Sequence, residues 1–248
     1  MIEAILPTCT AAAEAFGDPP QARLLPEEAG LVARAVPSRR REFTTARHCA
    51  RQALSALGLP PVPVLRGPFG APLWPAGVVG SITHCAGYRC GVVARGGDVA
   101  SLGVDAEPDV PLPSGAEDVI ALPWEAGHLR HLDAVRPRVN WGRLLFSAKE
   151  SVYKAWFPLG GRMLSFEHAT VTFETPSVGG TDCDADAPDA RATGFFSARM
   201  HAAAAEGRAP APGLLYGRWL AARGLLLTSV VIPAAAPAPL RPPAPHLR

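Results

Sequence analysis

Residues 140–157 read NWGRLLFSAKESVYKAWF, and this stretch contains the clearest helical pattern in the chain. Its apolar residues recur every three or four positions, which is the period of an amphipathic helix. Asn140 can cap the start, and Pro158 is expected to end the helix because proline removes a backbone donor and crowds the preceding turn. A helix with one continuous apolar face needs a partner layer to cover it.

A second amphipathic helix is expected upstream, with a start signal at Ser38 and a stop signal at Gly58. Arg40, Arg47 and Arg51 follow one another along a single stripe of this helix. The spacing leaves two interpretations open, because such a stripe can be an ordinary solvated basic face or part of a site for an anion.

Short β-rich runs are expected between and after these two helices. Three of them lie between the helices, at 78–83, 88–94 and 99–106. Three more follow the second helix, at 171–173, 192–200 and 225–232. The connections within the first group are short and turn-like, so we expect that group to form an antiparallel meander. A Gly/Asp/Ala-rich loop is expected at 176–190.

The order of helices and strands predicts an α+β fold with two lobes in one chain. We divide the chain into an N-terminal lobe at 1–103, a C-terminal lobe at 104–232 and a Pro/Ala-rich tail at 233–248 that cannot build a core. Both lobes run from a helix into strands, but no repeat is evident in the letters.

Composition excludes several classes of function. The chain has 248 residues, 48% of them hydrophobic, and a net charge of +2, which is too balanced to indicate a nucleic-acid-binding protein. Five cysteines without a CxxC pair favour reduced core thiols in a cytoplasmic protein. The first residues lack the basic region of a signal peptide, and no apolar run is long enough to cross a membrane.

Asp105 and Glu107 stand two residues apart at the end of an expected strand, so their carboxylates project from the same face. Two like charges this close need a cation or hydrogen-bond donors beside them. Magnesium suits a few carboxylates together with substrate phosphates and water. The simpler alternative is a solvated strand edge.

Two further groups of polar residues carry candidate chemistry. Glu150 and Lys154 share a face of the long helix and follow Lys149, although a Glu–Lys pair at this spacing is also an ordinary helix-stabilising contact. Ser81, Thr83 and His84 end the first strand and enter a tight turn, where they could donate to a phosphate or simply be exposed.

The pair of motifs GVDAEP (103–108) and FSAKESVYKAW (146–156) resembles the paired signature of the 4′-phosphopantetheinyl transferases. The upstream blocks RREFTTARHCARQAL (40–54), RGPFGAPLWP (66–75) and GSITHC (80–85) are similar to those of the siderophore-synthetase branch of that family. The resemblance covers most of residues 38–157 and implies two similar lobes, with coenzyme A lying in the cleft between them.

The resemblance also implies residue roles. Magnesium ligands would be Asp105, Glu107 and Glu150, and Glu150 would also be the candidate base. Lys154 would contact the pyrophosphate of coenzyme A and act in catalysis. Further contacts with coenzyme A are expected from Arg40, Arg47, Arg66, Ser81, Thr83, His84 and, less directly, Lys149.

The expected reaction moves the 4′-phosphopantetheine arm of coenzyme A to a serine of an apo carrier protein and releases 3′,5′-ADP. The length of the chain matches the monomeric, two-lobed type of the family. Carrier proteins of fatty-acid, polyketide or non-ribosomal peptide synthases are the expected partners. Two rival functions are a non-catalytic coenzyme A-binding protein and a magnesium-dependent phosphohydrolase.

Overall fold

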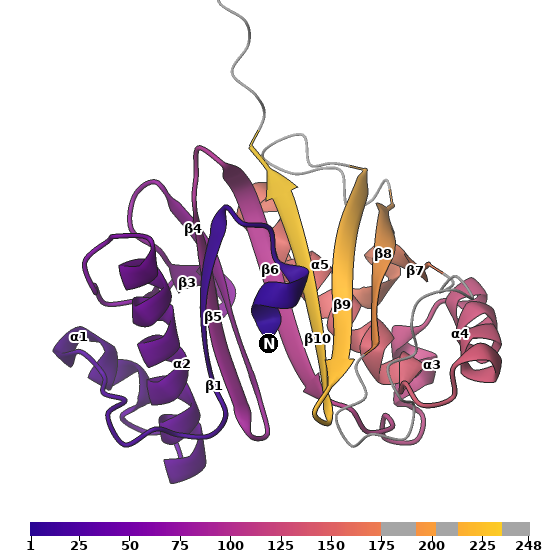
Figure 1. Cartoon of the computed structure of the whole chain (residues 1–248), viewed down its shortest axis with the longest axis horizontal. Helices are drawn as coiled ribbons and strands as arrows, with labels where there is room; N and C mark the ends of the chain where they lie inside the picture. The colour runs from indigo at the N-terminus through magenta and orange to yellow at the C-terminus, as the bar shows by residue number, and fades with distance from the viewer. Residues whose placement is uncertain (175–191, 202–212, 235–248) are drawn as a thin grey trace, which may run out of the picture.

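The computed structural model describes residues 1–174, 192–201 and 213–234, and it consists of two main sheets with helices around them (Figure 1). The loop expected at 176–190 and the tail beyond residue 234 lie outside the described residues. No helix in the described part of the chain is long and apolar enough to span a membrane.

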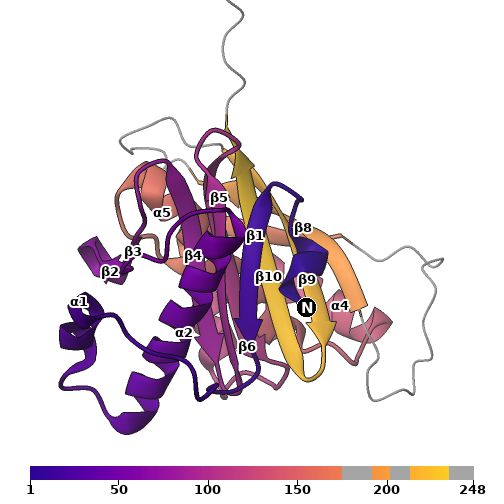
Figure 2. The same cartoon turned by 60° about the vertical axis from the view of Figure 1, so that its left-hand side comes forward.

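The first lobe has one long helix on a three-stranded sheet with strand order β1-β5-β4. Figure 2 shows this helix, α2, lying along the sheet. The main elements are β1 (Thr10–Ala15), α1 (Pro26–Ala29), α2 (Pro37–Ala56), β4 (Val78–Cys85) and β5 (Tyr88–Arg95). A small hairpin of β2 (Leu65–Arg66) and β3 (Pro72–Leu73) precedes β4, and short 3₁₀ turns cover Ile2–Ile5, Gly30–Val32 and Pro68–Gly70.

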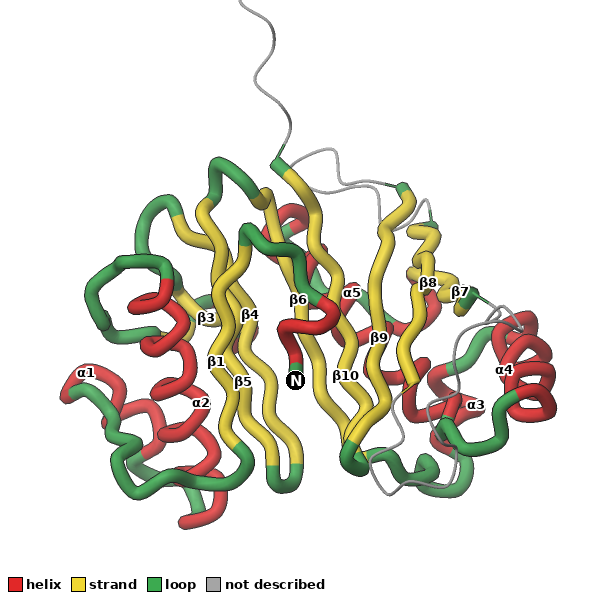
Figure 3. The backbone as a smooth tube through the Cα atoms, in the orientation of Figure 1, coloured by secondary structure: helices red, strands yellow, loops and turns green. Residues whose placement is uncertain are grey.

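The second lobe has a five-stranded sheet with strand order β6-β10-β9-β8-β7. Its strands are β6 (Val99–Pro108), β7 (Ala169–Phe173), β8 (Ala192–Met200), β9 (Leu214–Ala222) and β10 (Leu225–Pro233). Its helices are α3 (Ala116–Ile120), α4 (Pro123–Val135), α5 (Trp141–Gly160) and a 3₁₀ turn at Phe166–His168. Figure 3 shows strands in the middle of the molecule, with α2 at one side and α3 and α4 at the other.

The two lobes repeat one pairing scheme. In each, the first strand pairs with the last strand, which in turn pairs with the strand before it: β1-β5-β4 and β6-β10-β9. The last two strands of each lobe form a tight hairpin, with glycines in a left-handed conformation at Gly87 (φ 77°) and Gly224 (φ 69°). The expectation of an α+β fold with two similar lobes is confirmed.

The expected meander is wrong at its third strand. β6 forms its ladder with β10, from Pro108 opposite Leu225 to Val99 opposite Pro233, and not with β5. The partner of β6 lies more than a hundred residues later in the sequence, where a local turn pattern cannot detect it. All of β6 belongs to the second sheet, so the boundary that we expected at residue 103 falls inside this strand.

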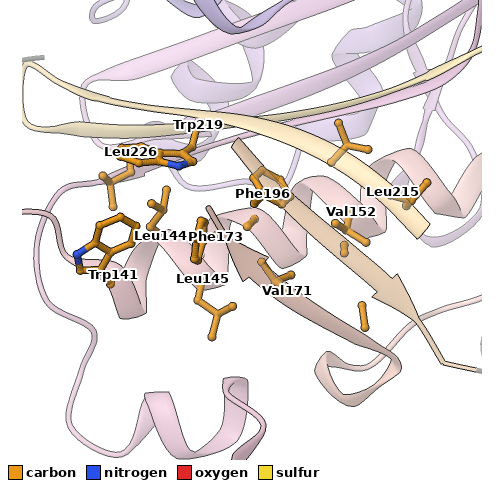
Figure 4. Packing of buried hydrophobic residues seen from close by; sticks show 14 of the residues in the cluster. Trp141, Leu144, Leu145, Val152, Val171, Phe173, Phe196, Leu215, Trp219 and Leu226 are labelled. Atoms are coloured by element: carbon orange, nitrogen blue, oxygen red, sulfur yellow. The ribbon is translucent and has the colours of Figure 1, made fainter. Parts of the chain in front are cut away.

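The long helix α5 covers one face of the second sheet. Its apolar side, from Trp141 to Val152, packs on residues such as Phe173 and Trp219 from the strands (Figure 4). The helix continues to Gly160, past the expected stop at Pro158, and ends at Gly161 in a left-handed conformation (φ 71°). This late in the helix, proline removes only a hydrogen bond of the last turn.

Candidate active site at the junction of the two lobes

Gly103 sets the distance between β6 and α5. A Cβ atom at this position would lie 2.0 Å from the carbonyl oxygen of Ser151 and 2.5 Å from the amide nitrogen of Ala155. Only glycine therefore allows the backbone of α5 to pack directly on the strand. This close approach brings residues of α5 beside Asp105 and Glu107, which follow Gly103 on the same face of β6.

Asp105 is buried and holds a direct ion pair with α5. Its Oδ1 accepts hydrogen bonds from the ammonium of Lys154 at 2.6 Å and from the hydroxyl of Thr83 at 3.2 Å. The residue is 5% exposed, and its second oxygen, Oδ2, has no hydrogen-bond partner in the structure. A buried carboxylate oxygen without a donor is costly, so this atom is available for a ligand.

The other two acids lie within electrostatic reach of Asp105. Glu107 accepts a hydrogen bond from Arg143 at 3.0 Å, and burial followed by the charge of Asp105 raises its pKa. Burial is also the main cause that raises the pKa of Glu150, with Asp105 adding to the effect and Lys154 opposing it. Arg143, Glu150 and Lys154 lie at i, i+7 and i+11, along one stripe of α5.

Asp105, Glu107 and Glu150 do not by themselves form a complete metal-binding site. Within the described ranges, no three His, Cys, Asp or Glu side chains converge closely enough to hold a metal ion by themselves. Magnesium, however, usually takes one or two protein carboxylates and completes its shell with water and substrate phosphates. The free Oδ2 of Asp105, with Glu107 and Glu150 close by, fits that kind of site.

The first lobe contributes a group of cations centred on the ring of Phe43. The guanidinium carbons of Arg47 and Arg66 lie 4.2 and 5.6 Å from the ring centroid. Arg47 is buried and donates from Nε to the carbonyl of Val64 at 2.7 Å. Burial is the main cause that lowers its pKa to about 10, and the neighbouring Arg66 adds to the effect. This concentration of positive charge favours binding of an anion.

Arg39, which the sequence did not single out, extends this group of cations toward the acids. Its Nη1 lies 2.6 Å from Nε2 of His84, whose pKa is lowered by burial and then by the charge of Arg39. Arg40 instead donates to the carbonyl of Ala33 at the exposed start of α2. The helical stripe pointed to Arg40 because that residue is seven positions from Arg47, and nothing in the spacing favoured Arg39.

Ser81 and Thr83 lie at the junction between the two lobes. Their hydroxyls accept hydrogen bonds from the backbone amides of Val104 and Ala106, at 3.1 and 3.0 Å. Both side chains are buried. They thus tie β4 to β6, which run side by side without a backbone ladder. Their expected contact with coenzyme A stays a prediction.

The ammonium of Lys149 binds none of the three acids Asp105, Glu107 and Glu150. Its ammonium donates to the carboxylate of Glu125 at 2.7 Å and to the carbonyls of Ile120 and Phe166, both at 2.9 Å. The side chain is 4% exposed. All three ammonium protons are used inside the protein, so none is left for a phosphate. The expected assistance of Lys149 to the pyrophosphate does not fit this position.

Two cavities open beside this face of α5, the larger next to Lys154 and the smaller next to Glu150. The larger, of about 480 Å³, lies between the 68–74 loop and α5, and its wall includes Trp74, Lys154 and Phe157. The smaller, of about 250 Å³, lies on the other side of Tyr153 and is mostly apolar. Tyr153 borders both. A ligand with a charged centre and an uncharged arm therefore has room on both sides of this helix face.

Comparison with known proteins identifies the family. The model of the 4′-phosphopantetheinyl transferase N-terminal domain matches residues 27–94, and that of the 4′-phosphopantetheinyl transferase superfamily matches residues 101–193. The chain is 47% identical to the 4′-phosphopantetheinyl transferase PptT of Mycobacterium tuberculosis, over 94% of this chain and 98% of that protein.

Other relatives agree with this result. The 4′-phosphopantetheinyl transferase Svp of Streptomyces mobaraensis is 48% identical, over 95% of this chain and 91% of that protein. Enterobactin synthase component D of Escherichia coli (strain K12) is 34% identical over 47% of this chain and 54% of that protein. The chain therefore belongs to the 4′-phosphopantetheinyl transferase superfamily.

Proposed function

We propose that this protein transfers the 4′-phosphopantetheine arm of coenzyme A to a serine of an apo carrier protein, with magnesium as the cofactor. The observation that carries the proposal is the buried, unpartnered Oδ2 of Asp105, beside Lys154 and across the lobe junction from a group of arginines. A centre of this kind suits a substrate that carries several phosphate charges and needs a counter-charge at its reacting group.

Asp105, Glu107 and Glu150 are the residues that would hold magnesium. When bound, the ion would supply positive charge beside the pyrophosphate of coenzyme A, which would stabilise the negative charge that builds up on the leaving group. Arg143, which pairs with Glu107, would keep that carboxylate oriented toward the site.

The cations of the first lobe are proposed to bind the phosphates of coenzyme A. Arg47 and Arg66 on the ring of Phe43, with Arg39 and His84, form the region suited to the 3′-phosphate. Lys154 would contact the pyrophosphate, since it lies beside Asp105 and lines the larger cavity. The smaller apolar cavity, next to Glu150, suits the uncharged pantetheine arm.

Glu150 is the proposed base. The serine hydroxyl would give its proton to the carboxylate of Glu150, directly or through a water, and its oxygen would form a bond to the β-phosphorus. The bond between that phosphorus and its bridging oxygen would break, and 3′,5′-ADP would leave. Burial raises the pKa of Glu150, which makes this carboxylate a better proton acceptor.

Carrier proteins of fatty-acid, polyketide or non-ribosomal peptide synthases are the proposed partners. Both lobes of the site come from one chain, so we propose a monomer. The described cysteines are free thiols, in keeping with a cytoplasmic protein.

Intact-protein mass spectrometry of an apo carrier protein tests this function. The carrier is incubated with the purified chain, coenzyme A and magnesium, with EDTA as the control. We expect one phosphopantetheine to be added to the carrier serine, 3′,5′-ADP to be released in equal amount, and EDTA to stop both. Release of 3′,5′-ADP without a modified carrier would instead indicate a phosphohydrolase. Binding of coenzyme A with neither product, across several carriers, would indicate a non-catalytic binder.

A further inference from the structure

A short motif occurs in both lobes at equivalent places. Residues 25–28 read LPEE and residues 122–125 read LPWE, so each has the form Leu-Pro-x-Glu. Each begins a helix that precedes the long helix of its lobe, with proline in the first helical turn. The glutamates, Glu28 and Glu125, are both 0% exposed.

The two glutamates make the same backbone hydrogen bonds. One oxygen of each accepts from the amide of the leucine that begins its motif, at 2.9 Å for Glu28 and 2.7 Å for Glu125. The other oxygen accepts from a valine amide beyond the long helix, Val64 at 2.9 Å and Val171 at 2.7 Å. Each carboxylate thus joins the chain before the long helix to the chain after it.

Each glutamate also pairs with a buried cation on the long helix. Arg51 of α2 donates to both oxygens of Glu28, at 2.8 and 2.6 Å, and Lys149 of α5 donates to Glu125 at 2.7 Å. The cations also donate to backbone carbonyls, Arg51 to that of Arg23 and Lys149 to those of Ile120 and Phe166. Loss of one partner from such a pair leaves a buried, uncompensated charge, which is strongly destabilising.

Each pair lies on its long helix close to a side chain for which a function is proposed above. Lys149 immediately precedes Glu150, and Arg51 lies one helical turn after Arg47. A buried pair fixes how its helix is rotated about its own axis, and that rotation sets where the neighbouring side chain points. The pair is thus a support for the group that meets the substrate.

We propose that Glu125–Lys149 and Glu28–Arg51 are two equivalent positioning pairs with separable effects, the first on the chemical step and the second on coenzyme A binding. The proposal rests on the roles proposed above for Glu150 and Arg47. It assigns to Lys149 a support of the catalytic helix face and no contact with the phosphates of coenzyme A.

Matched substitutions in the two lobes test the proposal. Lys149→Met and Arg51→Met each remove the cation. Lys149→Arg and Arg51→Lys keep the positive charge but change the geometry of the hydrogen-bond donors. For each variant, kcat and the KM for coenzyme A are measured with one carrier protein, together with thermal unfolding. Coenzyme A affinity is measured separately by calorimetry without a carrier.

We expect Lys149→Met to lower kcat by about 10- to 100-fold with little change in the KM for coenzyme A, as is typical for loss of a supporting partner. We expect Arg51→Met to raise that KM, and the calorimetric dissociation constant, by about tenfold with little change in kcat. Each charge-conserving variant should partly restore the parameter that its methionine variant changes, which is kcat for Lys149 and the KM for coenzyme A for Arg51. The other parameter should stay unchanged. If a methionine variant does not fold, its charge-conserving partner should still show the same separation.

A purely structural role would lower the folded fraction, and therefore kcat, in both lobes alike. That outcome, or a rise in the KM for coenzyme A in Lys149→Met with kcat unchanged, would overturn the proposal. Failure of the proposed function would be recognised separately, as a wild-type protein that modifies no carrier. The calorimetric measurement of coenzyme A binding still tests the proposal in that case, because only the Arg51 variants should lose affinity for coenzyme A.

Discussion

The ammonium of Lys154 lies 2.6 Å from Oδ1 of Asp105, and this contact joins α5 to β6 at the junction of the lobes. The side chain of Asp105 is 7% exposed and that of Lys154 is 26% exposed, so the carboxylate is enclosed while the ammonium can still contact a ligand. The pair leaves Oδ2 of Asp105 without a partner. One contact therefore holds together the two groups for which we propose these roles, a cation for the pyrophosphate and a carboxylate oxygen for the metal.

Asp105→Asn should reduce carrier modification by about 100-fold or more, because it removes both the free oxygen's charge and the partner of Lys154. Mass spectrometry of the carrier at saturating coenzyme A measures the effect. Asp98→Asn, on the exposed turn before the same strand, is the matched control and should leave the rate unchanged. An unaffected rate in Asp105→Asn would remove this residue from the site.

Arg66→Ala tests the phosphate-binding cations without disturbing the core, since Arg66 is exposed whereas Arg47 is buried. The loss of one charge-assisted hydrogen bond is worth about 1.5–3 kcal/mol, so the KM for coenzyme A should rise by roughly 10- to 100-fold with kcat retained. Arg34→Ala, also exposed but outside this group, serves as the control. Equal KM values in the two variants would exclude Arg66 from binding.

The sequence predicted the local elements of this fold well and its long-range pairings poorly. The helix at 140–157 and the strand at 192–200 were recognisable because their residues alternate or recur with a fixed period. β1, with the sequence TAAAEA, was missed because alanine has little preference for strands. β6 was assigned to the wrong sheet because its partner is remote in the sequence.

The acids and Lys154 could be predicted because a family motif fixes them, but their surroundings could not. Arg143 pairs with Glu107 across 36 positions of sequence, and no motif marks it. Lys149 lies inside the family motif, yet its three acceptors direct it into the protein. A signal for Glu125 was present in the repeated Leu-Pro-x-Glu, although the repeat is recognisable only once the shared geometry is known.

Gly103→Ala should destabilise the fold, because the added methyl group would overlap the backbone of α5 at Ser151. Overpacking at a rigid backbone contact costs about 1–3 kcal/mol, and here the helix that carries Glu150 would also have to move. Denaturant unfolding measures the loss, and activity should fall with it. Gly97→Ala, where nothing lies within 4 Å of the new methyl, should leave stability nearly unchanged. Equal stabilities would show that α5 does not rely on this close approach.

The raised pKa values of Glu107 and Glu150 predict how stability varies with pH when magnesium is absent. Between the ordinary carboxyl pKa and the raised one, the native protein binds more protons than the unfolded chain. The stability that this provides is complete below the ordinary value and is lost as pH rises through the raised value. Glu150→Gln removes one of these groups, so the wild type in EDTA should lose stability relative to this variant as pH rises.

Magnesium should reverse that loss, because a ligand that binds only the native state stabilises it by mass action, by about 2.7 kcal/mol at a hundredfold excess over its dissociation constant. Thermal unfolding of the wild type, of Glu150→Gln and of the exposed control Glu3→Gln, with and without magnesium, measures both effects. The wild type and Glu3→Gln should gain stability from magnesium above the raised pKa, and Glu150→Gln should gain little. Parallel curves for all three proteins would contradict the role of Glu150 as a metal ligand, since only a carboxylate that exchanges its proton for the ion couples the two effects.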